Sequence, residues 1–184
     1  MQPSRTLLDD GRWHFQYGPI DLVISADGDA TAIHQAIESS WLRFVEILPE
    51  LVAELSQLRL PLQQTLQQPM LVESPVARRM VAACWPHRAQ FITPMAAVAG
   101  AVADEMICFF SGNPCVQRAS INNGGDIALH LSPGESLRVG LYADVARLDA
   151  AQLKNKLLLD GQFSVDAAMP VRGVATSGSG VRMK

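Results

Sequence analysis

The sequence predicts an α+β protein in which a mainly antiparallel sheet packs against helices. Apolar residues alternate with polar ones over residues 13–24 and again within 116–141, which is typical of half-buried strands. Between these regions, apolar residues recur at steps of three and four, which is typical of amphipathic helices. The length of 184 residues fits a single domain, residues 1–184, with a full hydrophobic core.

The first predicted elements are a β-hairpin and a long helix. The hairpin has strands over residues 13–17 and 20–24, joined at Gly18-Pro19. The helix carries apolar residues at helical spacing from Ile33 to Leu58. Pro49 is a candidate position for a kink in this helix.

Two further helices are predicted to begin with the same pair of residue types. Ser74-Pro75 and Thr93-Pro94 each offer a hydroxyl group that can cap a helix, followed by a proline that the first helical position tolerates. The first helix is expected to end near Trp85-Pro86 and the second near Phe110. Small residues over 96–103 would let a neighbouring backbone approach the second helix closely.

The remaining signals are mostly those of strands. We expect residues 116–121, 127–131 and 137–141 to form adjacent antiparallel strands. A short helix is predicted over 149–159, and a last strand over 170–176.

The composition argues against nucleic-acid and membrane partners. The net charge of -3 gives no field that would gather phosphate backbones or anionic lipid. The most continuous apolar run, Met95 to Ala103, is too short to span a bilayer, and the N-terminus lacks the pattern of a signal peptide. We therefore expect a cytoplasmic protein. Charged residues reach only 18%, so we also expect a homo-oligomer that buries apolar surface.

No metal ligand or catalytic residue is assigned from the sequence. Cys84, Cys108 and Cys115 are odd in number and lack C-x-x-C spacing, so buried thiols are predicted. The four histidines have no ligand-like spacing. Asp104 and Glu105 are adjacent on a helix, which directs them about 100° apart and disfavours a working carboxylate pair. One of them is expected to face water.

The segment formed by Asn122, Asn123, Gly124, Gly125 and Asp126 is the first candidate for a ligand site. Asparagine and glycine tolerate positive φ, and paired glycines let a ligand reach backbone N–H groups. The alternative is a plain hairpin turn, because Asn-Gly between strands is a strong hairpin signal. Its chemistry alone favours the plain turn.

Two other segments are candidates for the same site. Thr93 opens a helix whose N–H groups and dipole would favour an anion such as a phosphate, and the alternative is an ordinary capped helix. Thr176, Ser177 and Gly178 offer two hydroxyls and a flexible backbone after a strand, and the alternative is a disordered tail. Neither segment matches a nucleophile elbow or a P-loop.

Residues 91–100, 121–127 and 172–178 occur in an order that resembles the uncharacterised ApbE-like family, relatives of the FAD:protein FMN transferases. The resemblance implies a T-fold-like α+β architecture and an FAD site made by glycine-rich turns and a helix start. Gly124-Gly125-Asp126 is similar to the family's Gly-Gly-acidic turn. Thr176-Ser177-Gly178 is similar to its Thr-Ser-Gly turn near the flavin.

The departures from that family weaken the catalytic expectation. The transferases move FMN from FAD onto a threonine of a target protein with the help of magnesium. Val98-Ala99-Gly100 stands where they commonly carry a lysine, and the chain stops at Lys184, before the segment with their main magnesium ligands. We therefore expect the C-terminal part of the domain to be missing, and magnesium to bind only if that region is supplied.

The sequence thus predicts a protein that binds FAD, FMN or a related nucleotide and lacks the metal motif of a complete transferase. Two alternatives stay open. One is a non-catalytic accessory protein in a reduced-pterin, methanopterin-type one-carbon pathway, which the narrow family's associations imply. The other is a structural oligomeric domain without a ligand.

Overall fold

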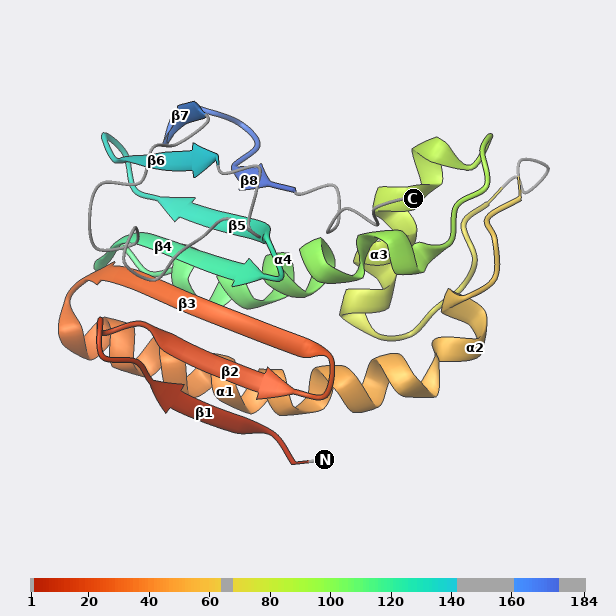
Figure 1. Cartoon of the computed structure of the whole chain (residues 1–184), viewed down its shortest axis with the longest axis horizontal. Helices are drawn as coiled ribbons and strands as arrows, with labels where there is room; N and C mark the ends of the chain where they lie inside the picture. The colour runs from red at the N-terminus through yellow and green to blue at the C-terminus, as the bar shows by residue number, and fades with distance from the viewer. Residues whose placement is uncertain (1, 64–67, 142–160, 176–184) are drawn as a thin grey trace, which may run out of the picture.

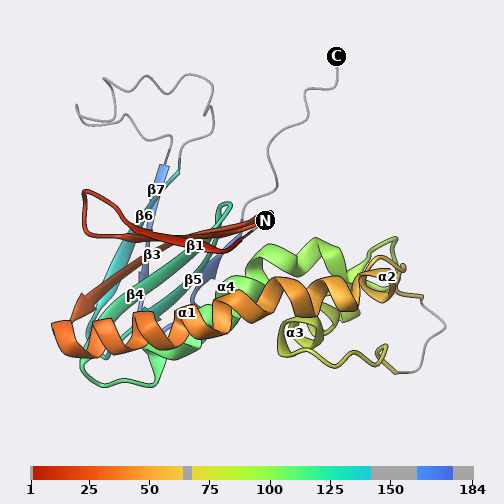
Figure 2. The ribbon, with the colours of Figure 1, turned by 90° about the horizontal axis from the view of Figure 1, so that it is seen from below.

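The computed structural model of the chain describes residues 2–63, 68–141 and 161–175. Within these residues, a six-stranded antiparallel sheet has the strand order β1-β2-β3-β4-β5-β8 (Figure 1). Figure 2 shows α1 and α4 along one face of this sheet, with α2 and α3 beyond the ends of the strands. The predicted α+β class, with a mainly antiparallel sheet packed against helices, is confirmed.

The bounds of the elements are as follows. The strands of the large sheet are β1 (Ser4–Leu7), β2 (Trp13–Tyr17), β3 (Ile20–Gly28), β4 (Val116–Asn123), β5 (Asp126–Leu131) and β8 (Gly173–Val174). A separate antiparallel pair is formed by β6 (Ser136–Leu141) and β7 (Gly161–Asp166). The helices are α1 (Ala30–Ala53), α2 (Leu55–Leu58), α3 (Pro75–Cys84) and α4 (Val98–Ser111), with 3-10 turns η1 (Trp85–His87) and η2 (Pro94–Ala97).

The predicted hairpin and long helix are both present. Strands β2 and β3 pair around the tight turn at Gly18, whose φ is +59°. Helix α1 starts after Asp29, whose carboxylate accepts a hydrogen bond of 2.9 Å from the backbone N–H of Ala32. The helix continues through Pro49, and the short helix α2 follows Glu54. Strand β1 was not predicted and extends the sheet beyond β2.

The two helix starts that look alike in sequence differ in structure. The hydroxyl of Ser74 accepts a hydrogen bond of 3.2 Å from the N–H of Ala77, so the predicted cap of α3 is confirmed. Thr93 makes no such side-chain bond, and the chain after it winds first as the 3-10 turn η2 before α4 begins. The cap predicted at Thr93 is therefore wrong.

The strands after α4 follow the prediction only in part. β4 and β5 are antiparallel neighbours as expected. β6 does not pair with β5. It pairs instead with β7, which was not predicted, while β8 takes the place beside β5. The last strand covers only Gly173–Val174 rather than 170–176, and the helix predicted over 149–159 lies outside the described residues.

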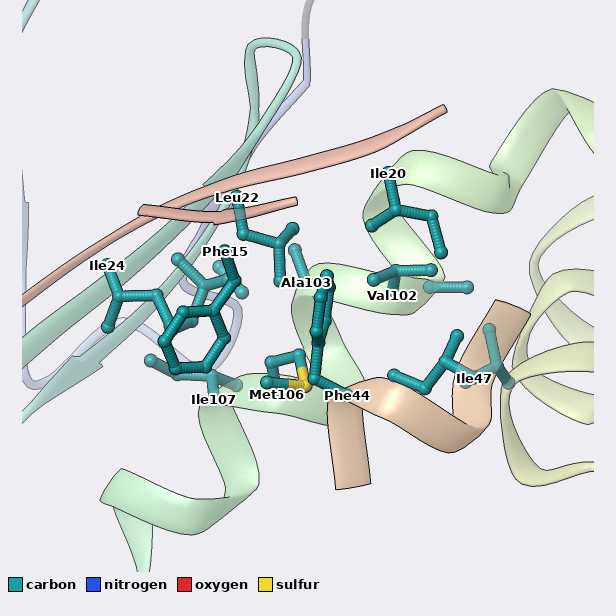
Figure 3. Close-up of a cluster of buried hydrophobic side chains, with 14 of the residues drawn as sticks. Phe15, Ile20, Leu22, Ile24, Phe44, Ile47, Val102, Ala103, Met106 and Ile107 are labelled. Carbon is teal, nitrogen blue, oxygen red and sulfur yellow. The ribbon is translucent and has the colours of Figure 1, made fainter. Parts of the chain in front are cut away.

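The main core lies between the sheet and helices α1 and α4 (Figure 3). Alternate residues of the strands point toward these helices, because side chains of a strand alternate between its faces. The members of this core include Phe15, Leu22, Ile24, Phe44, Ile47, Val102, Met106 and Phe110. A smaller cluster of Leu129, Leu131 and Val165 lies on the opposite face, where β6 and β7 cover the sheet.

The corner between β3 and α1 packs directly against the loop before β4. A Cβ added at Gly28 would lie 2.3 Å from the carbonyl oxygen of Cys115, and the φ of Gly28 is +145°. The N–H of Asp29 donates to the same oxygen over 2.9 Å. Glycine is needed here because any side chain would collide with the backbone of the loop.

Helix α4 and the turn η2 before it form a long, apolar helical segment. The segment Pro94–Ser111 is long and apolar enough, by length and composition, to cross a membrane, with a mean hydropathy of 1.3. In the structure, Ala103, Met106 and Phe110 of this segment are buried against the sheet and neighbouring helices. Inside the structure, 39% of this segment is buried.

The cysteine prediction holds for one residue of three. Cys84 is buried, whereas Cys108 and Cys115 are exposed thiols.

Candidate functional site

The segment between β4 and β5 is a two-residue hairpin turn. Asn123 and Asp126 face each other across the strands, and Gly124 and Gly125 between them have φ values of +61° and +103°. Positive φ at both central residues is the geometry that suits a hairpin, because its twist matches that of the strands. The N–H of Gly125 donates to Oδ1 of Asn122 over 2.9 Å. One of the two glycine amides is thus occupied within the turn.

The side chains around this turn do not converge on one cavity. Asn122 lines a cavity of about 260 Å³ on the sheet face that β6 covers. Asn123 lines a cavity of about 450 Å³ on the helix side. Asp126 lines a third cavity, of about 440 Å³, between α4 and the β5–β8 edge. The pleat directs Asn122 and Asn123 to opposite faces of the sheet. Asn123 and Asp126 are cross-strand partners on the same face, and there they line two different cavities.

We call the third of these the acidic cavity. Helix α4 contributes Gly100 and Asp104, which are four residues apart and therefore on the same side of the helix. A Cβ added at Gly100 would lie 3.7 Å from Oδ2 of Asp126, so the glycine keeps space in front of that carboxylate. The full lining is Gly100, Asp104, Asp126, Ile127, Ala128, Pro170, Val171, Arg172, Gly173, Val174 and Ala175.

The described lining of the acidic cavity carries two carboxylates and one guanidinium. Partial burial raises the pKa of Asp104 above its usual value, and the positive charge of Arg79 opposes this shift. Arg172 is the one basic residue among the described lining residues, and its guanidinium donates to the carbonyl oxygen of Leu131 over 2.8 Å. Within the part of the chain that the structure describes, no group of three or more His, Cys, Asp or Glu side chains could hold a metal ion.

Glu105, next to Asp104, has a different role. It accepts hydrogen bonds of 2.9 Å from Arg43 and 3.2 Å from Arg79, and only 13% of its side chain is exposed. Arg43 also pairs with Glu50 over 2.7 Å, and the hydrogen bond to Glu50 contributes most to raising the pKa of the guanidinium. This ion network joins α1, α3 and α4. The expectation that one of the two carboxylates faces water fits Asp104, which is exposed.

The sequence-predicted site residues are only partly assembled by the fold. Asp126 and the segment leading to Ala175 share the acidic cavity, whereas Thr176, Ser177 and Gly178 lie outside the described residues. Thr93 does not line this cavity, and its carbonyl oxygen accepts a hydrogen bond from the thiol of Cys84.

Gly100 and Asp104 are lining residues of the acidic cavity that the sequence did not predict as site residues. Gly100 was considered as one of the small residues of its helix and as a departure from a lysine pattern, and Asp104 as a neighbour of Glu105. The spacing of Gly100 and Asp104 on one helix face was the available signal.

The cavity beside Asn123 is lined almost entirely by apolar side chains, and we call it the apolar cavity. The amide of Asn123 donates to the carbonyl oxygen of Ala99 over 3.1 Å, which joins the end of β4 to α4. The lining residues are Pro19, Ile20, Leu48, Leu51, Val52, Leu55, Arg59, Met95, Val98, Ala99, Val102 and Asn123. Ile20 and Val102 lie at one end of the core cluster in Figure 3.

The fold and these cavities define an α+β protein with ligand-sized hollows on two sides of a single helix, α4. The chain belongs to the family described as AbpE bacteria, whose sequence profile matches residues 5–182. None of the curated proteins matches the chain.

The match to this family corrects the family assignment that was based on the sequence resemblance. The matched family is a different one from the ApbE-like family, so the assignment to relatives of the FAD:protein FMN transferases is wrong. The resemblance rested on short segments rich in glycine and alanine. Such segments recur wherever a hairpin turn or a closely packed helix is needed, as Gly124-Gly125 and residues 96–103 are used here.

Proposed function

We propose that this protein binds FAD, FMN or a related nucleotide in the acidic cavity, with a magnesium ion between the ligand's phosphates and the protein's carboxylates. The observation that carries the proposal is the meeting of Asp104, Asp126 and the backbone of β8 around one cavity of about 440 Å³. Cavities of roughly 300–1,000 Å³ are the usual size for small-molecule and cofactor sites.

The backbone of β8 suits a flat heterocycle. Gly173 and Val174 pair with Ala128 and Ile127 of β5 on one side, and no strand of the described ranges pairs with β8 on the other. A strand at the edge of a sheet presents N–H and C=O groups to whatever approaches it. The edge of a flavin or purine ring carries donors and acceptors that match such groups. Gly100 leaves room for the ring, because it has no side chain on the cavity side of α4.

The charge of the cavity determines the form of the ligand. Among the described lining residues, Asp104 and Asp126 carry carboxylates, and the guanidinium of Arg172 is bonded to the carbonyl oxygen of Leu131. Magnesium usually binds through one or two carboxylates together with the phosphates of its ligand. Asp104 and Asp126 supply carboxylates of that kind, so the nucleotide is expected to bind as its magnesium complex. No transferase step is proposed.

The proposal is tested by titrating the purified protein with FAD and with FMN. Flavin fluorescence and calorimetry should show saturable binding in the presence of magnesium, at least about tenfold weaker in excess EDTA. Asp126→Asn should reduce the magnesium dependence. Gly100→Leu should fill the cavity and abolish binding, whereas the matched control Gly100→Ala should retain it, since its Cβ makes an ordinary contact with Asp126.

The same titration separates the alternatives. Saturable binding of a reduced pterin with no binding of FAD or FMN would contradict the flavin proposal and favour the accessory role. A protein that binds none of these ligands would favour the structural domain.

The homo-oligomer and the T-fold-like architecture stay predictions. Leu71 and Phe91 are 92% and 85% exposed, which supports the first of them. Sedimentation velocity over a range of protein concentrations would measure the oligomeric state. A molar mass of one chain at all concentrations would rule out the oligomer.

A further inference from the structure

We propose that the apolar cavity is a second binding site, which takes a straight acyl chain with a carboxylate head. The site lies on the opposite side of Ala99 and Gly100 from the acidic cavity and shares no lining residue with it. The proposal is therefore independent of flavin binding.

The walls of the apolar cavity come from elements far apart in the sequence. The β2–β3 turn contributes Pro19 and Ile20, and α1 contributes Leu48, Leu51 and Val52. The remaining walls come from α2 and Arg59 after it, from η2, from α4, and from Asn123 at the end of β4. A hollow of about 450 Å³ lined in this way favours apolar ligands, because filling it removes apolar surface from water and restores dispersion contacts.

Two close contacts shape this hollow. A Cβ added at Gly18 would lie 2.8 Å from Cδ2 of Leu48, so the glycine lets the β2–β3 turn settle directly on α1. The amide of Asn123 is bonded to the carbonyl oxygen of Ala99, which satisfies the polar group at this wall. The inner part of the cavity is therefore apolar, and the side-chain amide of Asn123 at its wall already donates a hydrogen bond within the protein.

One charged residue determines the head group. Arg59 lies among the cavity's lining residues, is exposed, and makes no ion pair with any residue in the described ranges. None of the described residues that line this cavity is acidic. A ligand with an apolar tail and a negative head can thus bury its tail while its head pairs with the guanidinium. A carboxylate matches the fork geometry of arginine.

The first experiment measures binding of hexanoate, octanoate and decanoate to the full chain, below their micelle concentrations, by calorimetry. Each buried methylene contributes roughly 0.8 kcal/mol, so affinity should rise by about twofold to fourfold per methylene until the cavity is full. Decanol and decyltrimethylammonium should bind more weakly than decanoate. An affinity that does not change with chain length would overturn the proposal.

Two pairs of variants test the position of the ligand. Ala99→Leu places a larger side chain in the cavity and should weaken decanoate binding by about tenfold or more, whereas Ala96→Leu, on the exposed side of η2, should not. Arg59→Gln should weaken decanoate by about threefold or more and leave decanol unchanged. Arg78→Gln, an exposed arginine of α3, is its control.

The folded state of each variant is checked by its melting curve, so that a loss of binding is not confused with unfolding. Equal effects of Ala99→Leu and Ala96→Leu would contradict the site. A wild-type dimer that Ala99→Leu converts to a monomer would show that a second copy of the chain fills the cavity, and would also overturn the proposal.

Discussion

The acidic cavity and the apolar cavity have almost the same volume, about 440 and 450 Å³, but differ in the charged side chains that line them. Both are bounded by α4. Gly100 and Asp104 line the first, while Val98, Ala99 and Val102 line the second. Successive residues of a helix are rotated by about 100°, so the neighbours Ala99 and Gly100 belong to different sites. The difference teaches that one helix can separate a polar site from an apolar one without any change in its backbone.

The largest expected effect concerns the wall of the apolar cavity. Val102 is fully buried, and Val102→Ala would remove two methyl groups from the wall. We expect the free energy of unfolding to fall by about 2 kcal/mol, since lost burial and an enlarged hollow act together. Urea unfolding measures this. Val98→Ala, at a half-buried position in the same lining, should lower the free energy of unfolding by clearly less. Equal decreases for the two variants would show that Val98 contributes as much to stability as the fully buried Val102.

A smaller effect of opposite sign is expected on the other side of the helix. Gly100→Ala adds a Cβ that would meet Oδ2 of Asp126 at 3.7 Å, an ordinary contact. Glycine within a helix costs about 1 kcal/mol relative to alanine. The substitution should therefore raise the free energy of unfolding by up to about 1 kcal/mol. A loss of stability would show that the acidic cavity tolerates no added atom at this point.

The smallest effect concerns the charge in the acidic cavity. Partial burial raises the pKa of Asp104 in the folded protein, so its ionised form destabilises the fold. The free energy of unfolding should therefore increase as the pH falls through the raised pKa, because Asp104 becomes neutral. Asp104→Asn should slightly raise the melting temperature at neutral pH, and the difference from wild type should shrink in acid. A lower melting temperature at neutral pH would indicate that the ionised carboxylate is stabilised by its surroundings.

The sequence predicts most of the fold wherever the apolar pattern is local. Alternation over residues 13–24 correctly predicted a hairpin, and helical spacing correctly predicted α1 through Pro49. Pairing between distant strands left no local pattern. β8 consists of two residues whose place beside β5 depends on tertiary packing. The similar Ser-Pro and Thr-Pro pairs begin their helices differently, because capping depends on how the chain enters the helix.

The candidate site was less accessible from the sequence. Asn122 to Asp126 were treated as one unit, although the pleat of β4 directs Asn122 and Asn123 to opposite faces. That separation could have been predicted. The cavities themselves could not, because they depend on how closely α4 approaches the end of the sheet. Gly100 acquires its role only from the position of Asp126 across the space between two elements.

The corner at Gly28 has a consequence for the order in which the chain folds. β3 and β4 are the central pair of the sheet, and residues 29 to 115 lie between Gly28 and its partner Val116. Closing so long a loop is entropically costly, and contacts of long sequence separation slow folding. We expect the hairpin of β2 and β3 and the helices to form early. The pairing of β3 with β4 would then be the late, rate-limiting step. It is complete when the backbone at Gly28 packs against the carbonyl group of Cys115.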